Sequence, residues 1–224
     1  MTTLTGGALI QQQYYAGLGV AALNMGTPHT QYRPAGATLN DPLNSANSLG
    51  TLNANMNIGG KYPGQTKISQ NYWQAIVDGT KLQEGDYLVG HLTWCVVALD
   101  QLMPPIVLQC DNALTVQRAT QAFSATEGAY QTTETVLTGI PCSIALKRDK
   151  GFNKPIGFPA ASNTDAPMPL YTILVYTGNS PTAGVPIKSG DMLTDLAGKT
   201  YKVESEQWSP IGTELSAVDY YPRA

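Results

Sequence analysis

The apolar residues of this chain come in short runs from residue 65 onward, and Gly, Pro and Asp separate one run from the next. β-branched and aromatic residues dominate these runs, which favours strands. Short runs with such punctuation are typical of antiparallel β-structure. The run at 72–77 also fits a helix, because Ile68, Tyr72 and Ile76 are four residues apart. We expect strands at residues 72–77, 87–89, 94–99, 106–110, 114–118, 142–147, 171–176, 199–204 and 213–218.

One motif of the form apolar-x-x-Gly-Asp-x-Leu occurs twice in this β-rich part. It spans residues 82–88 and 187–193, and each copy leads through a short turn into a strand that carries an aromatic residue, Trp94 or Tyr201. Gly admits the positive φ of a tight turn, and Asp can accept hydrogen bonds from nearby backbone amides. We interpret the copies as equivalent hairpins of two small barrels or sandwiches. Chance is the alternative, because Gly-Asp hairpins are common.

Residues 7–25 have the periodicity of a helix. Gly26 and Pro28 supply a stop after it. Gly17 and Gly19 each weaken a helix by up to about 1 kcal/mol, so this helix needs a packing partner. The small residues also allow another backbone to approach closely. The apolar positions that recur at intervals of three or four are Ile10, Tyr14, Leu18, Ala21 and Met25.

Residues 26–64 are rich in Asn, Gly, Ala, Thr, Ser and Pro, and they specify neither a helix nor a strand well. A structureless loop of this length is uncommon inside a compact domain. The segment is either disordered or an arm that docks on a neighbouring copy, and its large apolar residues favour the arm. Tyr is enriched at protein interfaces, and an isolated Arg can anchor an arm, although a solvated Arg is an equal alternative. The expected assembly interface consists of Tyr14, Tyr32, Arg33, Leu39, Leu43, Leu49, Leu52, Met56 and Ile58.

The chain carries few charges. Its 13 Lys and Arg and 16 Asp and Glu give a net charge of −3, and charged residues make up 13% of it, about half of the roughly 25% typical of soluble domains. A neutral polar coat favours a surface that faces other protein copies. No basic run exceeds Lys147-Arg148, which argues against sequence-specific nucleic-acid binding. The longest apolar run, 94–99, is far shorter than the roughly 20 residues of a membrane helix, so we expect no membrane span.

Cysteine and histidine give no sign of a metal site. Cys95, Cys110 and Cys142 include no C-x-x-C pair, and we expect them to be reduced, mostly buried thiols. His29 and His91 have no acidic or Cys ligand beside them at the spacing of a zinc site. We therefore expect no metal site and no cofactor.

Two patterns that can signal an enzyme have simpler explanations here. Residues 17–22 match the G-x-G-x-x-A phosphate-binding fingerprint, but no buried strand precedes them. A glycosidase needs a pair of facing carboxylates. Asp191 with Asp195 and Glu204 with Glu206 are the closest pairs, but the former flank a predicted hairpin and the latter alternate on one face of a strand. We expect no catalytic residues.

Several segments together resemble virion structural proteins of tailed bacteriophages. The resemblance covers most of the chain through soft motifs, and it implies small β-barrels that assemble as rings and lock to their neighbours with extended arms. No hallmark of a tail tube or of a peptidoglycan-cleaving enzyme accompanies it. The segments that carry it are EGDYLVG at 84–90, TWCVVA at 93–98, PPIVL at 104–108, TGIPCSI at 138–144, IKSGDMLTDLAGKTYKVE at 187–204, YAGLGVAA at 15–22 and QYRP at 31–34.

Taken together, we expect a mainly β protein with two small antiparallel barrel or sandwich modules after an N-terminal helix and an extended arm. The expected division is 1–64 for the helix and arm, 65–135 for the first module and 136–224 for the second. The expected function is a non-enzymatic, ring-forming subunit near the phage tail or baseplate.

Its expected partners are other phage structural proteins and further copies of itself in a ring such as a hexamer. We expect it in the virion, assembled in the cytoplasm of the bacterial host. A head-to-tail neck connector or head-closure protein is the near alternative. A baseplate-associated glycan hydrolase is the alternative from another class.

Overall fold

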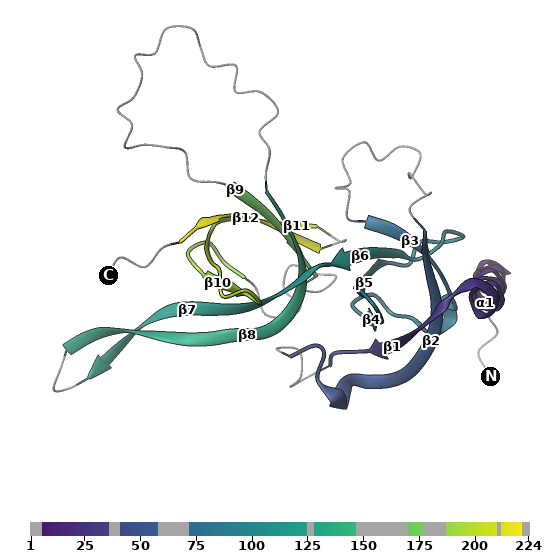
Figure 1. The fold of residues 1–224 in the computed structure, drawn as a ribbon, viewed down its shortest axis with the longest axis horizontal. Coiled ribbons are helices and arrows are strands. Elements are labelled where there is room, and N and C mark those ends of the chain that lie inside the picture. The colour runs from purple at the N-terminus through teal and green to yellow at the C-terminus, as the bar shows by residue number, and fades with distance from the viewer. Residues whose placement is uncertain are drawn as a thin grey trace, which may run out of the picture.

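The computed structural model contains two closed β-barrels that lie side by side, with a helix on the outside of the first (Figure 1). The helix, α1, spans Gly6–Met25. For residues 57, 121–124 and 128–131 only the backbone is described. The structure describes residues 6–35, 41–57, 72–124, 128–146, 170–176, 187–209 and 212–220.

The two barrels share one topology. The first runs in the order β1-β2-β3-β6-β5-β4, and the second in the order β7-β8-β9-β12-β11-β10, with antiparallel pairing throughout. Adding six to each strand number of the first order gives the second, so the chain repeats one six-stranded design. The first barrel consists of β1 (Thr27–Tyr32), β2 (Ser48–Asn57), β3 (Tyr72–Val77), β4 (Tyr87–Val89), β5 (Thr93–Ala98) and β6 (Ile106–Cys110). The second consists of β7 (Asn112–Ser124), β8 (Gly128–Leu146), β9 (Leu170–Val175), β10 (Met192–Asp195), β11 (Thr200–Ser209) and β12 (Gly212–Asp219).

Each barrel has its own apolar interior, and a third apolar cluster joins the two. Along β5, Trp94 and Val96 point into the first barrel, whereas Cys95 and Val97 point outward into the third cluster. Side chains from β9 of the second barrel, including Tyr176 at its end, cover that outer face. Both faces of β5 are therefore buried, one in the interior of the first barrel and the other against the second barrel.

The mainly β architecture after an N-terminal helix is confirmed, and so is the equivalence of the two Gly-Asp hairpins, which lie at the same place in the two barrels. Every expected strand overlaps an observed one, and residues 72–77 form β3, so the helical alternative is wrong. The helix has its packing partner within the chain. A Cβ at Gly19 would lie 2.8 Å from Asp78 Cβ, and one at Gly26 would lie 3.0 Å from the backbone of Ala54.

The expected arm is wrong for the part of it that the structure describes. Residues 27–32 and 48–57 are β1 and β2, two strands that the first barrel needs in order to close. The inward residues of β1 are the polar His29 and Gln31, so β1 has no apolar alternation to detect. In β2 the inward residues do alternate, but one of them is the small Ala54.

The expected division of the chain also changes. The first barrel runs from residue 27 to 110, and the second begins at Asn112, because β7 pairs with β8 and β10. A boundary at 135 would cut through β8. Short 3-10 turns at Ser45–Asn47 and Gly79–Lys81 complete the first barrel.

Candidate functional site

Each Gly-Asp hairpin is held by an ion pair between a buried Asp and a partly buried Arg. In the first barrel Arg33 donates to Asp86 through Nε and Nη2, each at 2.7 Å. In the second barrel Arg118 makes the same two contacts with Asp191, also at 2.7 Å. Gly85 and Gly190 both have φ +89°, which requires glycine at this turn. These two Arg–Asp locks explain why the motif recurs.

The locks change the interpretation of Arg33 and Asp191. Hydrogen bonding to Asp86 raises the pKa of Arg33, and hydrogen bonding to Asp191 raises that of Arg118. Arg33 therefore anchors its own chain, which corrects its expected role in docking on a neighbour. The Asp191 carboxylate is only 3% exposed and is already held by a guanidinium, so it is not free to act as the acid of a hydrolase.

The remaining carboxylates of the expected pairs also have other surroundings. Asp195 accepts hydrogen bonds from the backbone of Ala197 at 2.9 Å and of Lys199 at 2.8 Å, and so closes the β10–β11 turn. Glu204 and Glu206 are exposed on β11. Within the described residues, no group of three or more His, Cys, Asp or Glu side chains could hold a metal ion.

The barrels also share an aromatic pair. Trp73 and Trp94 meet edge-to-face in the first barrel with ring centroids 5.2 Å apart, and Tyr171 and Tyr201 do so in the second at 5.1 Å. In the second barrel the Lys199 ammonium lies 4.2 Å from the centroid of Tyr171. A cation thus sits over the aromatic pair of the second barrel.

Carboxylate and phenol groups hold that cation. Lys199 Nζ is 2.8 Å from Asp219 Oδ1 and donates to the Tyr171 hydroxyl at 2.6 Å. Burial lowers the pKa of Lys199, but the hydrogen bonds to Asp219 and Tyr171 more than offset this and raise it. The end of the second barrel beside the β10–β11 turn is therefore occupied by the ammonium group of Lys199.

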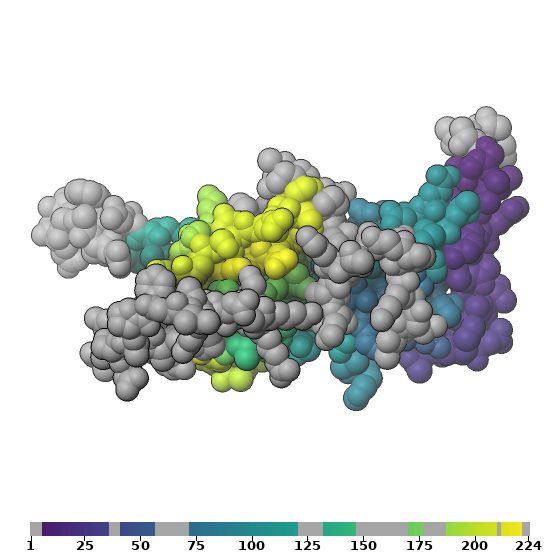
Figure 2. Space-filling view, turned by 90° about the horizontal axis from the view of Figure 1, so that it is seen from above, coloured from purple at the N-terminus to yellow at the C-terminus, as the bar shows by residue number. Residues whose placement is uncertain are grey.

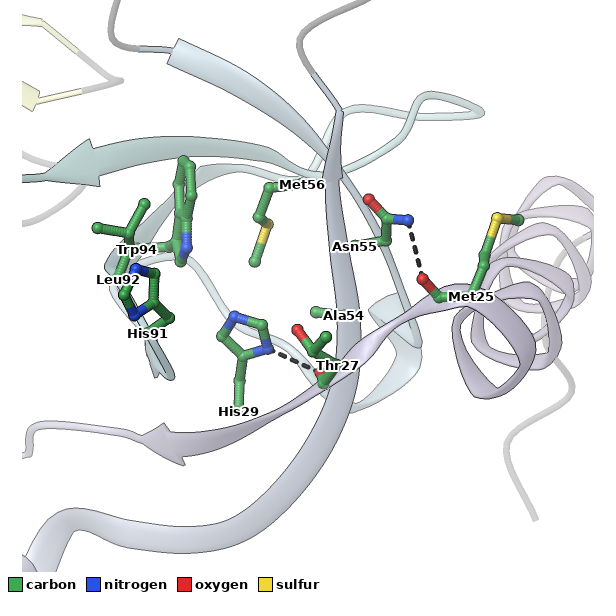
Figure 3. Close-up of a pocket in the computed structure, with 9 residues that line it drawn as sticks. All are labelled: Met25, Thr27, His29, Ala54, Asn55, Met56, His91, Leu92 and Trp94. Atoms are coloured by element: carbon green, nitrogen blue, oxygen red, sulfur yellow. Dashed lines mark hydrogen bonds between the residues drawn. The ribbon is translucent and has the colours of Figure 1, made fainter.

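The same end of the first barrel is a pocket of about 240 Å³. Figure 3 shows that His29 of β1 and Met56 of β2 reach into it, with Trp94 and the β4–β5 turn on the opposite side. The strand registers align Leu92 with Lys199, so the first barrel has an apolar residue where the second has its cation. The residues that line the pocket are Met25, Thr27, His29, Ala54, Asn55, Met56, His91, Leu92 and Trp94.

His29 is the polar side chain at the base of this pocket, and it is 6% exposed. Its Nδ1 lies 2.9 Å from the carbonyl oxygen of Thr27. A carbonyl only accepts, so Nδ1 carries a proton, and in a neutral imidazole with this tautomer the lone pair is on Nε2. A Cβ at residue 90 would lie 2.7 Å from His29 Cδ2, so the imidazole fits only because that residue is glycine.

A second candidate region is the hairpin that β7 and β8 form. β10 pairs with β7 only as far as Gln117, and β9 pairs with β8 only from Cys142 onward, whereas β7 and β8 pair with each other out to Ser124 and Gly128. We call the paired residues 118–124 and 128–134 the ribbon. Figure 1 shows it projecting from the second barrel. Among the described residues, no third strand pairs with either of its edges.

The exposed face of α1 is a third candidate region. The helix packs on the first barrel through Tyr15 and Ala22, which are 6% and 1% exposed. Residues 6–25 contain no charged side chain. Figure 2 shows α1 at one end of the elongated molecule. The large apolar residues exposed on the helix are Leu9, Ile10, Val20, Leu23 and Met25.

The expected interface residues do not form one surface. Tyr14 is half-buried on α1, beside Tyr15. Tyr32 and Leu43 pack against the cluster between the barrels, and Leu52 and Met56 pack against the interior of the first barrel, which corrects the expectation that they dock on a neighbouring copy. Leu49 is 55% exposed, and its role stays a prediction. Leu39 and Ile58 lie outside the described residues.

Comparison with known proteins identifies no relative of this chain. No family model, curated protein or solved structure matches this chain. In the described part of the chain, no helix combines the length and apolar character that crossing a membrane requires.

The pocket and the ribbon were both missed in the sequence. His29 and His91 are far apart in the chain, so no ligand spacing could reveal that they line one pocket. The ribbon carries small and polar residues such as Thr, Gln and Ala instead of an apolar run. The signal that could have found both is the repeat itself, because aligning the two motifs shows where one half of the chain departs from the other.

Proposed function

We propose that this protein is a non-enzymatic structural subunit of a bacteriophage particle, which forms a ring of copies near the tail or baseplate. The phage setting is supported by the resemblance of several sequence segments to virion proteins. The assembly role is supported by the ribbon, which is the observation that carries the proposal. In this proposal the ribbon takes the place of the arm first expected at residues 26–64.

A two-stranded ribbon is at most marginally stable alone in water. No further strand of the described residues pairs with its outer edges, and edges of this kind are templates for pairing with another chain. Natural proteins guard such edges with charged side chains, especially Lys, and with Pro, but residues 119–133 contain no Lys, Arg or Pro, and Glu127 is the one charge among them. A neighbouring subunit that adds a strand to the ribbon pairs with the backbone groups along those edges.

The exposed face of α1 supplies a second contact. Leu9, Val20 and Leu23 are 47%, 61% and 70% exposed. A group of exposed apolar residues is typical of a surface that contacts another protein. Because α1 carries no charge, contact with an uncharged surface requires no charge to be desolvated. The ribbon and α1 lie at opposite ends of the molecule, which suits head-to-tail contacts around a ring (Figure 1).

The proposal is tested by removing the ribbon. Arg118 and Glu134 are cross-strand partners, so an Asn-Gly turn can replace residues 119–133 without disturbing the barrel. Light scattering after size-exclusion chromatography, over a range of concentrations, measures the mass of each protein. We expect the full chain to form a closed oligomer and the shortened chain to be a folded monomer.

Leu196→Ser is the matched control, because Leu196 is 78% exposed on the second barrel but lies outside the ribbon and α1. It should assemble like the full chain. The proposal is wrong if the shortened chain assembles equally well, or if the full chain is monomeric at every concentration.

A further inference from the structure

The pocket of the first barrel contains two side chains, His29 and Met56, that are replaced by aliphatic residues in the second barrel. The strand registers align His29 with Leu114, and Met56 with Ile144, in the second barrel. Leu114 is fully buried and Ile144 packs against the same interior. A barrel of this topology therefore closes with aliphatic residues at both positions. The imidazole and the thioether in the first barrel call for another explanation.

His29 is arranged as a ligand. An imidazole that binds a metal through one nitrogen usually donates its other N–H to a carbonyl or carboxylate, which fixes the tautomer. The 2.9 Å contact from Nδ1 to the Thr27 carbonyl does this and leaves the Nε2 lone pair available. Among the described residues, nothing donates a hydrogen bond to Nε2. Figure 3 shows this edge of the ring directed toward the space that Met56 and Trp94 border.

The second barrel shows that this end of the design accommodates a cation. There Lys199 lies over Tyr171 and Tyr201, and Asp219 supplies the countercharge. The first barrel keeps the aromatic pair, but the registers place Leu92 and Gln109 where the second has Lys199 and Asp219. An ammonium group in the first barrel would therefore lack its carboxylate partner. An ion that forms bonds to neutral donors would not need one.

We propose that this pocket binds a soft monovalent metal ion of the copper(I) and silver(I) class through His29 Nε2 and Met56 Sδ, with His91 at its mouth. Imidazole and thioether groups suit such ions, whereas hard cations require oxygen ligands, and no carboxylate is among the described residues that line the pocket. The Trp94 ring adds cation–π attraction. This inference does not depend on the assembly role.

Silver(I) is a suitable probe, because it needs no reducing agent. The full chain, labelled with 13C in its methionine methyl groups and 15N in its histidine rings, is titrated with silver nitrate and followed by NMR. We expect the Met56 methyl and the His29 Nε2 signals to move together and to saturate at one equivalent. The signals of methionines outside the pocket, such as Met192, should stay in place.

Residue-specific signals also separate this site from the thiols. Thiolates are strong ligands for soft ions, but Cys95, Cys110 and Cys142 are buried, and burial raises their pKa and keeps them protonated. If silver instead shifts the signals around the cysteines and leaves His29 and Met56 unchanged, the proposed site is wrong.

Two variants take their residues from the second barrel. His29→Leu and Met56→Ile each remove one donor and introduce the side chain that the second barrel has at the aligned position. Each should weaken silver binding by more than about 100-fold, since losing only an outer-shell partner already lowers metal affinity by roughly 10–100-fold. Met192→Ile is the control and should bind as the full chain does. Unchanged affinity in folded His29→Leu or Met56→Ile protein would overturn the proposal.

Discussion

The two barrels of this chain have the same topology but different surroundings. Both have an Arg–Asp lock, a glycine at φ +89° and an edge-to-face aromatic pair. The first is covered by α1 and by the second barrel, whereas the second keeps an outer face in water and extends the ribbon. The shared features are what the barrel requires. The features that differ, namely the ribbon, the pocket and the exposed face of α1, are where function is to be sought.

The outer face of one strand shows the difference most clearly. On β5, Cys95 and Val97 point outward and are fully buried, because the second barrel covers them. The equivalent positions on β11 are Lys202 and Glu204, which are exposed. The outward positions of this strand are therefore apolar where another part of the protein covers them and charged where they are exposed. The exposed apolar residues of α1, such as Val20 and Leu23, are the residues that the proposed contact with another copy would cover.

The largest expected effect comes from exchanging residues at this face. Val97→Glu places the residue of the second barrel at a position that is 0% exposed, and it should destabilise the protein by more than about 4 kcal/mol, because a buried charge without a partner is strongly unfavourable. The reciprocal Glu204→Val should change the free energy of unfolding by less than about 0.5 kcal/mol. Urea unfolding measures both. Equal effects would show that the second barrel does not cover β5.

Breaking the locks should have the next largest effect. Asp86→Ala and Asp191→Ala each remove a buried carboxylate that pairs with Arg and accepts a backbone N–H at 2.8 Å. Each should destabilise its barrel by about 3 kcal/mol, as measured by denaturant unfolding. Asp86→Ala should be the more harmful by about 1 kcal/mol, because Asp86 also accepts a hydrogen bond from the buried Gln31 amide at 2.7 Å and the second barrel has Val116 at that position. A large loss in one barrel and none in the other would contradict the equivalence of the locks.

A smaller effect is expected from replacing the glycine of each Gly-Asp turn, because only the turn of the first barrel also contacts the other barrel. Alanine at Gly190 meets no atom within 4 Å, so Gly190→Ala should destabilise by only about 1 kcal/mol of backbone strain. At Gly85 the new Cβ would lie 2.9 Å from Tyr176 Cε1, so Gly85→Ala should lose roughly 1 kcal/mol more. Thermal unfolding of both variants checks the difference. If Gly190→Ala proved the more harmful, Tyr176 would not pack on this turn.

The smallest effect is a gain in stability. His29→Leu restores the residue that the second barrel has at this position and fills part of the pocket with apolar surface. Without added metal, it should stabilise the protein by about 1 kcal/mol or less and raise its melting temperature slightly. Calorimetry measures the shift. A clear loss of stability would mean that His29 serves the fold, which would weaken the case for a ligand.

Local patterns in the sequence predicted much of the fold. The helix, the Gly-Asp hairpins and the strands with apolar runs depend on neighbouring residues, and all of them are found in the structure. β1 was missed because its inward residues, His29 and Gln31, are polar. β10 was missed because only its first two residues, Met192 and Leu193, are apolar. Neither strand is specified by its own sequence, since each is held by the strands on either side.

The candidate sites depend on contacts that the sequence does not display. Arg33 reaches Asp86, and Arg118 reaches Asp191, only after the barrels close. A lone Arg was therefore interpreted as an anchor for a partner, when its partner is in the same chain. His29 and His91 likewise share a pocket only through the closure of the first barrel.

The central claim is that the ribbon assembles copies by pairing along its edges. Hydrogen–deuterium exchange of the amides in residues 118–124 and 128–134 tests it directly, with the barrel amides as an internal reference. In dilute protein, the amides on the outer edges of the ribbon should exchange rapidly, and they should become protected as the concentration rises and copies associate. Exchange in the ribbon that stays rapid while the protein forms oligomers would contradict the claim.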